Sequence, residues 1–345
     1  MAASDPQLPI ILYHYPYSPY AKRIVWYLEL RGIPYSQCLQ PPILPRPDLA
    51  RLGISYRRIP VLSIGRDIYL DTRLILAKLS LLHPPTPSQT HLSPASTAEH
   101  KAIERLLEIH AIDGGLFTRA SQLLPPTLPL LRDPKFRADR ADYTGTKPDA
   151  AAAAALRPEA LNEVQRAMAL LETTLLADGR DWVLATPEPS LADIEAVWPL
   201  HWLVSLPGAL PAGLVAARFP RVAAWIARFD AAVAEARARV GKPRSVSGEE
   251  AQRVILAAGW NEEALERGGG MVDGEAEPVV AFHGLRKGAM VELWPTDSGS
   301  AHRDVGALVA VDAGEVVITT AEGVRLHAPR HGFRFEPAGK SVASL

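Results

Sequence analysis

The sequence predicts an α/β domain, then an all-helical domain, then a small β-rich module, which is an α/β plus all-α organisation. Three observations predict it. Up to residue 83, short apolar runs flank helical patterns. Between residues 98 and 242, apolar positions recur every three or four residues. From 279 to 335, short β-branched runs are separated by Gly or Asp turns.

The first domain is expected at residues 8–83. "IILYHY" at 10–15 has the short, apolar and aromatic character of a strand, and Gly32 is a natural stop for the helix that follows it. The expected elements, in order, are a strand at 10–15, a helix at 19–31, a strand at 34–40, a hairpin at 57–71 and a helix at 72–83. The order β-α-β-β-β-α is that of a thioredoxin-like domain.

Residues 84–97 are rich in Pro, Ser and Thr and are expected to form a linker. The helical domain, at 98–242, should include helices across 97–124, 158–178 and 218–241. Ser190 and Asp193 lie three residues apart at a helix start, which resembles a capping box. The alanine run at 149–156 is expected to be a loop or a helix start.

The last part, at 247–338, is expected to hold a short helix at 247–260 and then a small β-rich module, a compact barrel or a curled sheet. The three glycines at 268–270 predict a flexible break. The module is locally basic, but it has few aromatic residues between its basic ones. A packing, lid or oligomer role is therefore favoured over nucleic-acid binding.

Composition narrows the function. The formal net charge of −1 lacks the basic signature of a nucleic-acid-binding protein. The single cysteine, Cys38, excludes an intrachain disulfide, and no signal peptide is visible, so a cytoplasmic location is expected. No apolar run approaches the roughly 20 residues of a membrane span. No Cys–His spacing suggests zinc, so no metal is expected.

Four motifs resemble those of the glutathione S-transferase family. Their order and spacing agree with the family over residues 10–241. They are "YSPYAKRIVWYL" at the first strand-to-helix junction, "RRIPVL", "IYLDTRLIL" and "PSLADIEAVWPL". The C-terminal β-rich module lies outside the usual family pattern, and its presence resembles fungal members with an extra C-terminal domain.

Two roles are possible for Ser18. Serine before a proline at the first helical position is a good N-cap, which needs no ligand. The resemblance implies a second role, because a serine in this position of the family stabilises the glutathione thiolate. A helix N-terminus and a hydroxyl donor both favour a thiolate over a thiol. Tyr15, Tyr17 and Tyr20 are nearby hydroxyls that could take this role, and absence of catalysis is the third alternative.

The resemblance also implies the glutathione-binding residues. Pro60 should follow a cis peptide bond, which turns the backbone N–H and C=O of Ile59 toward the cysteinyl part of glutathione. Asp71 and Thr72 begin a helix, where the γ-glutamyl carboxylate would be held. Asp71 is shorter by one methylene than the glutamate of the family. Arg58 could meet the glycyl carboxylate.

The function expected from the resemblance is that of a glutathione-dependent transferase, with glutathione as co-substrate. A small hydrophobic electrophile would enter from the helical side, in detoxification or in fungal secondary metabolism. A glutathione-dependent isomerase or lyase of a natural-product intermediate is one alternative. A non-catalytic binding or scaffold protein is the other. A homodimer is possible, although the added module could block the usual interface.

Overall fold

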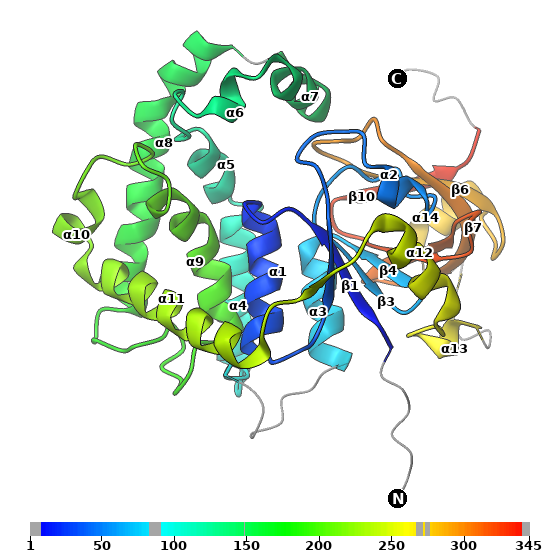
Figure 1. The fold of residues 1–345 in the computed structure, drawn as a ribbon, viewed down its shortest axis with the longest axis horizontal. Coiled ribbons are helices and arrows are strands. Elements are labelled where there is room, and N and C mark those ends of the chain that lie inside the picture. The colour runs from blue at the N-terminus through cyan, green and yellow to red at the C-terminus, as the bar shows by residue number, and fades with distance from the viewer. Residues whose placement is uncertain (1–7, 83–90, 148, 267–271, 273–276, 340–345) are drawn as a thin grey trace, which may run out of the picture.

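The fold consists of a helical lobe packed against a ten-stranded sheet (Figure 1). It is seen in a computed structural model that describes residues 8–82, 91–147, 149–266, 272 and 277–339. The expected break at 268–270 and the first half of the expected linker lie outside the described residues.

The N-terminal domain has the predicted thioredoxin-like order. Ser18 caps α1, Pro19 occupies its first position, and Gly32 follows its end with a φ of 64°. The elements are β1 (Ile10–His14), α1 (Pro19–Leu30), β2 (Ser36–Leu39), α2 (Pro47–Ala50), β3 (Val61–Ile64), β4 (Asp67–Leu70) and α3 (Thr72–Leu82).

The helical domain follows, with more breaks than the sequence predicts. The helical signal across 97–124 corresponds to two helices, because Gly114 and Gly115, the latter at a φ of 79°, separate them. The elements are α4 (Ala98–Ala111), α5 (Leu116–Ser121), α6 (Pro129–Arg132), α7 (Pro134–Thr144), α8 (Ala150–Leu170), a π-helical turn (Leu171–Leu175), α9 (Leu191–Val204), α10 (Leu214–Arg218) and α11 (Pro220–Val240).

The alanine run at 149–156 is a helix start and not a loop. Asp149 caps α8, because its Oδ1 accepts hydrogen bonds from the backbone N–H groups of Ala151 and Ala152 at 2.8 and 3.2 Å. The first two turns of α8 are exposed, so propensity and the cap, not packing, form the helix there.

The capping box at the start of α9 is confirmed. The Asp193 carboxylate accepts hydrogen bonds from the backbone N–H and the hydroxyl of Ser190 at 2.8 and 2.7 Å. It also accepts from the Val183 N–H at 2.8 Å and from the Trp225 indole N–H at 2.9 Å. Asp193 therefore joins α9, α11 and the segment before α9 in the buried core.

Replacing Ser190 with alanine is expected to lower the free energy of unfolding by about 1 kcal/mol, because the N-cap hydrogen bonds are lost. Urea denaturation followed by circular dichroism measures this. An unchanged midpoint would contradict a stabilising role for the cap.

The C-terminal part is rich in strands, as predicted, but its strands join the N-terminal sheet and do not close into a compact barrel of their own. Strand β9 pairs with β4 in parallel, with Ile68 opposite Leu326, and joins the strands of the module to the N-terminal sheet. The elements are β5 (Arg244–Ser245), α12 (Gly248–Ala257), α13 (Glu263–Glu266), α14 (Pro278–His283), β6 (Met290–Pro295), β7 (Asp304–Val311), β8 (Glu315–Thr319), β9 (Arg325–Pro329) and β10 (Phe333–Pro337).

This pairing covers the edge of β4 that the N-terminal domain alone would leave open. The strand order is β10-β6-β7-β8-β9-β4-β3-β1-β2-β5. Unpaired edge strands invite pairing with another chain, and β9 removes that possibility at β4. The homodimer expected from the sequence stays a prediction.

Two hydrophobic cores lie on opposite faces of the sheet. Side chains alternate along β1, so Ile10 and Leu12 join the core under the helical lobe, while Ile11 and Tyr13 join the other core. The second core also takes in α12, α14 and the C-terminal strands. Burial on both faces holds the N-terminal sheet rigid between the two lobes.

Candidate active site

The strand register brings the three N-terminal motifs to one edge of the sheet. Tyr13, Val61 and Leu70 lie side by side on β1, β3 and β4. The chain segments that continue from these three residues at that edge are Ser18-Pro19, Ile59-Pro60 and Asp71-Thr72. Neighbouring strands are about 4.8 Å apart, so all three segments begin within roughly 10 Å.

Ser18 is the N-cap of α1. Its Oγ accepts a hydrogen bond from the Ala21 N–H at 3.2 Å, and the residue is only 3% exposed. Burial raises the pKa of the neighbouring Tyr15, while the charges of Arg140 and Arg46 and a hydrogen bond with Ser18 oppose that rise. A hydrogen bond that lowers the pKa of Tyr15 is one in which the Ser18 hydroxyl donates, so a bound thiolate would compete with Tyr15 for that proton.

The two other tyrosines of this segment differ in environment. Tyr17 is 53% exposed. Tyr20 is packed between Phe117 and Trp198, with ring centroids 4.7 Å away in each case. Burial raises the pKa of Tyr20, and Tyr143 and Asp71 add to the rise, so its phenol stays protonated at neutral pH. Neither placement tests a catalytic role, which stays a prediction.

The peptide bond between Ile59 and Pro60 is cis, as the resemblance predicts. Ile59 is buried, with 9% of its surface exposed. Among the described residues, the backbone N–H and C=O of Ile59 have no hydrogen-bond partner. Buried backbone groups are almost always paired, so this residue has capacity for a ligand.

Asp71 is the cap of α3. Its Oδ1 accepts from the Arg73 N–H at 2.9 Å, and its φ of 64° lies in the left-handed region, which non-glycine residues seldom adopt. Thr72 is buried, and its Oγ1 accepts from Arg23 Nη1 at 2.5 Å. Arg23 of α1 therefore holds the first turn of α3 through Thr72.

Arg23 belongs to a buried network of charges that the sequence did not reveal. The fully buried guanidinium is paired with Glu195 and lies 3.6 Å from Glu108. Arg73 Nε lies 3.1 Å from the other oxygen of Glu108. This network joins α1 and α3 to α4 and α9. It reaches the predicted glutathione site through the hydrogen bond from Arg23 to Thr72.

Arg58 has partners in the C-terminal module. Its guanidinium is paired with Asp297, and its Nε donates to the carbonyl of Ser298 at 3.0 Å. The neighbouring Arg57 is paired with Asp139 at 2.9 Å and with Asp142, both on α7. A glycyl carboxylate would therefore compete with internal partners at Arg58.

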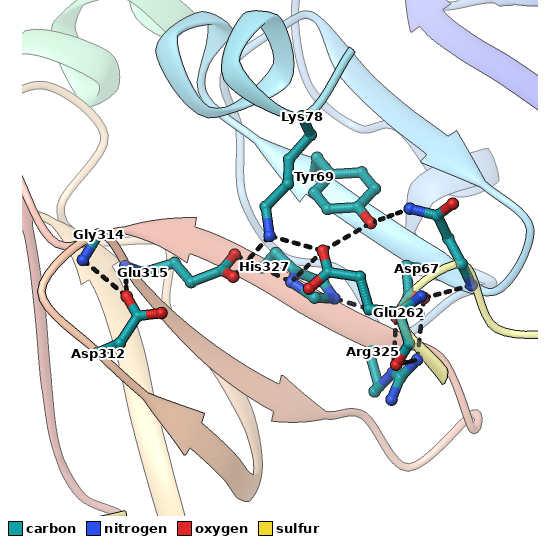
Figure 2. Close-up of polar contacts among 10 residues, drawn as sticks. Asp67, Tyr69, Lys78, Glu262, Asp312, Gly314, Glu315, Arg325 and His327 are labelled. Carbon is teal, nitrogen blue, oxygen red and sulfur yellow. Dashed lines mark hydrogen bonds and ion pairs between the residues drawn. The ribbon is translucent and has the colours of Figure 1, made fainter. Parts of the chain in front are cut away.

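A second polar cluster lies where β9 meets β4 (Figure 2). Glu262, Glu315 and His327 have ligand-type atoms within 4.8 Å of one another, the spacing of a metal site. Lys78 Nζ donates to both glutamates at 2.6 Å, so an ammonium already supplies the positive charge there. Local basicity around His327 was the only signal in the sequence, and it did not suggest this cluster.

A cavity of about 220 Å³ lies between α3 and α4. It is lined by Arg73, Leu76, Ala77, Ser80, Lys101, Glu104, Arg105, Glu108, Leu191 and Glu195. Ser18, Ile59 and Asp71 do not line it, so it is distinct from the predicted glutathione site. Among the described helices, none has both the length and the apolar character needed to cross a membrane.

Comparisons with known proteins agree with this geometry. Residues 12–87 match the family described as glutathione S-transferase, N-terminal domain, and residues 119–238 match a domain of unknown function (DUF7962). A search of curated proteins gave no match.

Several solved structures are similar to this chain, to different degrees. A glutathione S-transferase-like protein from Pseudomonas syringae is 24% identical, with a TM-score of 0.68 over 95% of this chain and 99% of its own. A glutathione S-transferase from Methylobacillus flagellatus with glutathione bound is 21% identical, with a TM-score of 0.45 over 65% of this chain and 98% of its own. A human glutathione S-transferase in apo form is 16% identical, with a TM-score of 0.47 over 72% and 99%.

The likeness to the Pseudomonas syringae protein spans nearly the whole chain, so the fold common to the two includes C-terminal strands. The expected likeness to fungal proteins stays a prediction. The chain therefore carries a glutathione S-transferase N-terminal domain at residues 12–87 and has the fold of glutathione S-transferase-like proteins.

Proposed function

We propose that the protein is a glutathione-dependent transferase in which Ser18 stabilises the thiolate of bound glutathione. The observation that carries this proposal is the meeting of Ser18, the cis Ile59-Pro60 bond and the start of α3 at one edge of the sheet.

The chemistry needs a thiolate at neutral pH. A free thiol has a pKa of about 8.5, and a helix N-terminus and a hydroxyl donor both lower it. Ser18 supplies both, because it caps α1 and its hydroxyl keeps a proton to donate. The thiolate sulfur would attack an electrophilic carbon, form a thioether bond and displace a leaving group, or add and leave a carbanion that takes a proton from water.

The backbone supports the peptide part of glutathione. The free N–H and C=O of Ile59 can pair with the cysteinyl unit as a strand would. The N-terminus of α3, at Thr72, offers its first N–H groups to the γ-glutamyl carboxylate. Asp71 would face the amino group of the ligand.

The aromatic groups beside α1 support a hydrophobic second substrate. Tyr20, Phe117 and Trp198 pack within 5.0 Å of one another, centroid to centroid, and Trp202 stacks on Phe117 at 5.5 Å. This group begins two residues beyond Ser18, on the helical side where an electrophile would approach.

Two alternatives remain as proposals. A glutathione-dependent isomerase or lyase would use the same thiolate but release it, so glutathione would not be consumed in a product assay. A non-catalytic binding or scaffold protein is favoured by the pairing of Arg58 with Asp297, which engages a residue expected to bind glutathione. Stoichiometric capture of one protein partner without turnover of model electrophiles would support that alternative.

Replacing Ser18 with alanine is expected to lower kcat/KM for a model electrophile about tenfold to a hundredfold, because a hydrogen bond to a charged group contributes roughly 1.5–3 kcal/mol. The pKa of the bound thiol, read from the ultraviolet absorbance of the thiolate, should rise. Ser190→Ala is the matched control, because it removes an N-cap serine far from this site and should leave kcat/KM unchanged. Equal activity of Ser18→Ala and wild type would leave Ser18 as a cap alone.

Titration with reduced glutathione in a calorimeter tests the binding step itself. Saturable binding with a Kd between micromolar and millimolar, about −8 to −4 kcal/mol, is expected. Absence of heat up to roughly 10 mM, near −3 kcal/mol, would reject the transferase in favour of the binding protein.

A further inference from the structure

Helix α7 leaves the helical lobe and contacts the N-terminal domain. Asp139 Oδ1 accepts from the Leu44 N–H at 2.9 Å, and its carboxylate is paired with Arg57 at 2.9 Å. Asp142 is paired with the same arginine. Arg57 is 3% exposed, so these pairs are largely shielded from water on the arginine side.

The same helix contacts the C-terminal module. The Gly299 N–H donates to the Tyr143 carbonyl at 2.8 Å, and His302 Nε2 lies 2.8 Å from Asp142 Oδ2. A side chain at Gly299 would meet Arg57 at 2.9 Å, and its φ of 80° suits glycine alone. Three parts of the chain therefore meet at α7, which lies at the top of the helical lobe in Figure 1.

Tyr143 brings α7 to the predicted glutathione site. Its ring lies between the guanidinium groups of Arg57 and Arg140, at 5.0 and 4.7 Å from its centroid. Burial raises the pKa of Tyr20, and Tyr143 is the next largest cause of that rise. Arg57 comes two residues before Ile59, so Tyr143 lies beside the segment that carries the cis Ile59-Pro60 bond.

The contacts described above that hold α7 in place are hydrogen bonds and ion pairs. None of its residues is buried, so no apolar anchor fixes it to the fold. The side chain of Asp142 is 49% exposed, so its pairs with Arg57 and His302 contribute about 0–1 kcal/mol each, whereas breaking the largely buried Arg57–Asp139 pair from one side costs more. Segments with few buried apolar contacts open most readily.

We propose that α7 and the loop 297–302, together named the strap, cover the predicted glutathione site from the side of Arg57, Arg58 and Ile59, and open to admit a ligand to Ser18. Helix α7 belongs to the helical domain, and the loop 297–302 belongs to the C-terminal module. The two parts together would control access to a site on the N-terminal domain. The proposal rests on the proposed function only in taking glutathione and its electrophile as the molecules admitted.

A thiol placed at Ser18 reports the opening without any glutathione. Ser18→Cys would put a reactive thiol at a helix N-terminus, while native Cys38 is 1% exposed and burial raises its pKa to about 12. The rate of labelling by iodoacetamide, followed by intact mass, measures access to position 18. Wild type supplies the blank for Cys38.

Removing the charges of the strap should speed this labelling. In the Ser18→Cys background, Asp139→Asn with Asp142→Asn is expected to raise the rate about tenfold or more, and His302→Gln by less. The matched control is Asp178→Asn with Asp181→Asn, two exposed acidic residues of other ion pairs, which should leave the rate unchanged. At 1 M salt, the rate should rise in the Ser18→Cys parent and change little in the strap variant.

Equal labelling rates in the strap variant and its control would overturn the proposal. So would labelling of the parent as fast as that of the urea-unfolded chain. A strap variant that labels faster while glutathione fails to bind would keep the strap and reject the transferase, so the two failures are distinguishable.

Discussion

Replacing Arg23 with methionine is expected to lower the free energy of unfolding by about 3–5 kcal/mol at pH 8. Methionine keeps much of the volume, so the change removes the charge and its hydrogen bonds. It leaves the buried carboxylate of Glu195 without its partner and removes the donor to Thr72. Breaking a buried pair from one side costs far more than the pair contributes, because the remaining charge stays desolvated.

The loss should grow with pH, and the sign follows from Glu195. Burial raises the pKa of Glu195 to about 7, although Arg23 opposes that rise. Without Arg23 the pKa rises further, so the folded protein binds a proton that the unfolded chain releases near 4.5. Stability then falls as pH rises. At pH 5 the protonated carboxyl avoids the charge, and the loss should be smaller than at pH 8.

Urea denaturation at pH 5 and pH 8 measures both numbers. Arg166→Met is the control, because the Arg166–Glu163 pair is exposed and its loss should stay within about 0.5 kcal/mol. The double variant Arg23→Met with Glu195→Leu should recover half or more of the loss, because apolar side chains can replace a buried pair. A loss of the same size at both pH values would exclude an uncompensated charge at Glu195 as its cause.

Local chemistry explains which parts of the fold were predictable. Ser18-Pro19 and the Ser190–Asp193 pair begin their helices through side chains within three residues of one another, so the sequence shows them directly. Strand β1 was likewise predictable, because its short run is apolar and aromatic. The hairpin of β3 and β4 was readable because Gly65, at a φ of 56°, marks its turn.

Contacts between distant parts of the chain explain what was missed. Arg23 and Glu195 are 172 residues apart, and Asp67 and His327 are 260 apart, so no local pattern reveals either pair. Helix α7 has no apolar stripe, because polar contacts alone hold it. The joining of β9 to β4 depends on an open edge, which a strand pattern does not mark as paired or free.

In the candidate site, too, the features that depend on short motifs were predictable and the contacts between distant residues were not. The resemblance identified the backbone features, the cis bond before Pro60 and the capped start of α3, because these depend on short motifs. The partners of Arg58 are about 240 residues away in the C-terminal module, beyond the reach of any motif. Charged side chains around a cleft are therefore the least predictable part of this site.

The cluster at the junction of β4 and β9 is neutral only when His327 is protonated. Three carboxylates, from Asp67, Glu262 and Glu315, face three basic groups, from Lys78, Arg325 and His327. His327 is fully buried, with Nε2 3.0 Å from Asp67 Oδ1 and Nδ1 3.1 Å from Glu315 Oε2. Both ring nitrogens must carry protons to donate in both directions, which requires the imidazolium.

The shifted pKa values of His327 and Asp67 define the pH range in which the cluster stabilises the fold most. Burial alone would lower the pKa of His327, but hydrogen bonds with Asp67 and Glu315 raise it above the ordinary 6.5. Its contribution to stability is complete below 6.5 and is lost as pH rises through the folded pKa. Burial would raise the pKa of Asp67, but His327 and Arg325 hold it at about 2, so its contribution is lost only as pH falls below 3.8. The pKa of Glu315 is likewise lowered from 4.5 by His327 and Lys78 against the effect of burial, so the cluster should stabilise the fold most between 4.5 and 6.5.

Replacing His327 with glutamine should therefore cost about 3–5 kcal/mol at pH 6, and this cost should shrink as pH rises past the folded pKa. Glutamine can donate to one carboxylate and leaves the other uncompensated. The difference in unfolding free energy between wild type and variant, measured from pH 5 to 9, isolates this residue from other titrating groups.

His331→Gln is the control, because that side chain is 57% exposed and its loss should stay within about 0.5 kcal/mol at every pH. A cost that is constant from pH 5 to 9 would mean that His327 stabilises the junction as a neutral ring. The positive charge that balances the carboxylates would then come from Lys78 and Arg325 alone.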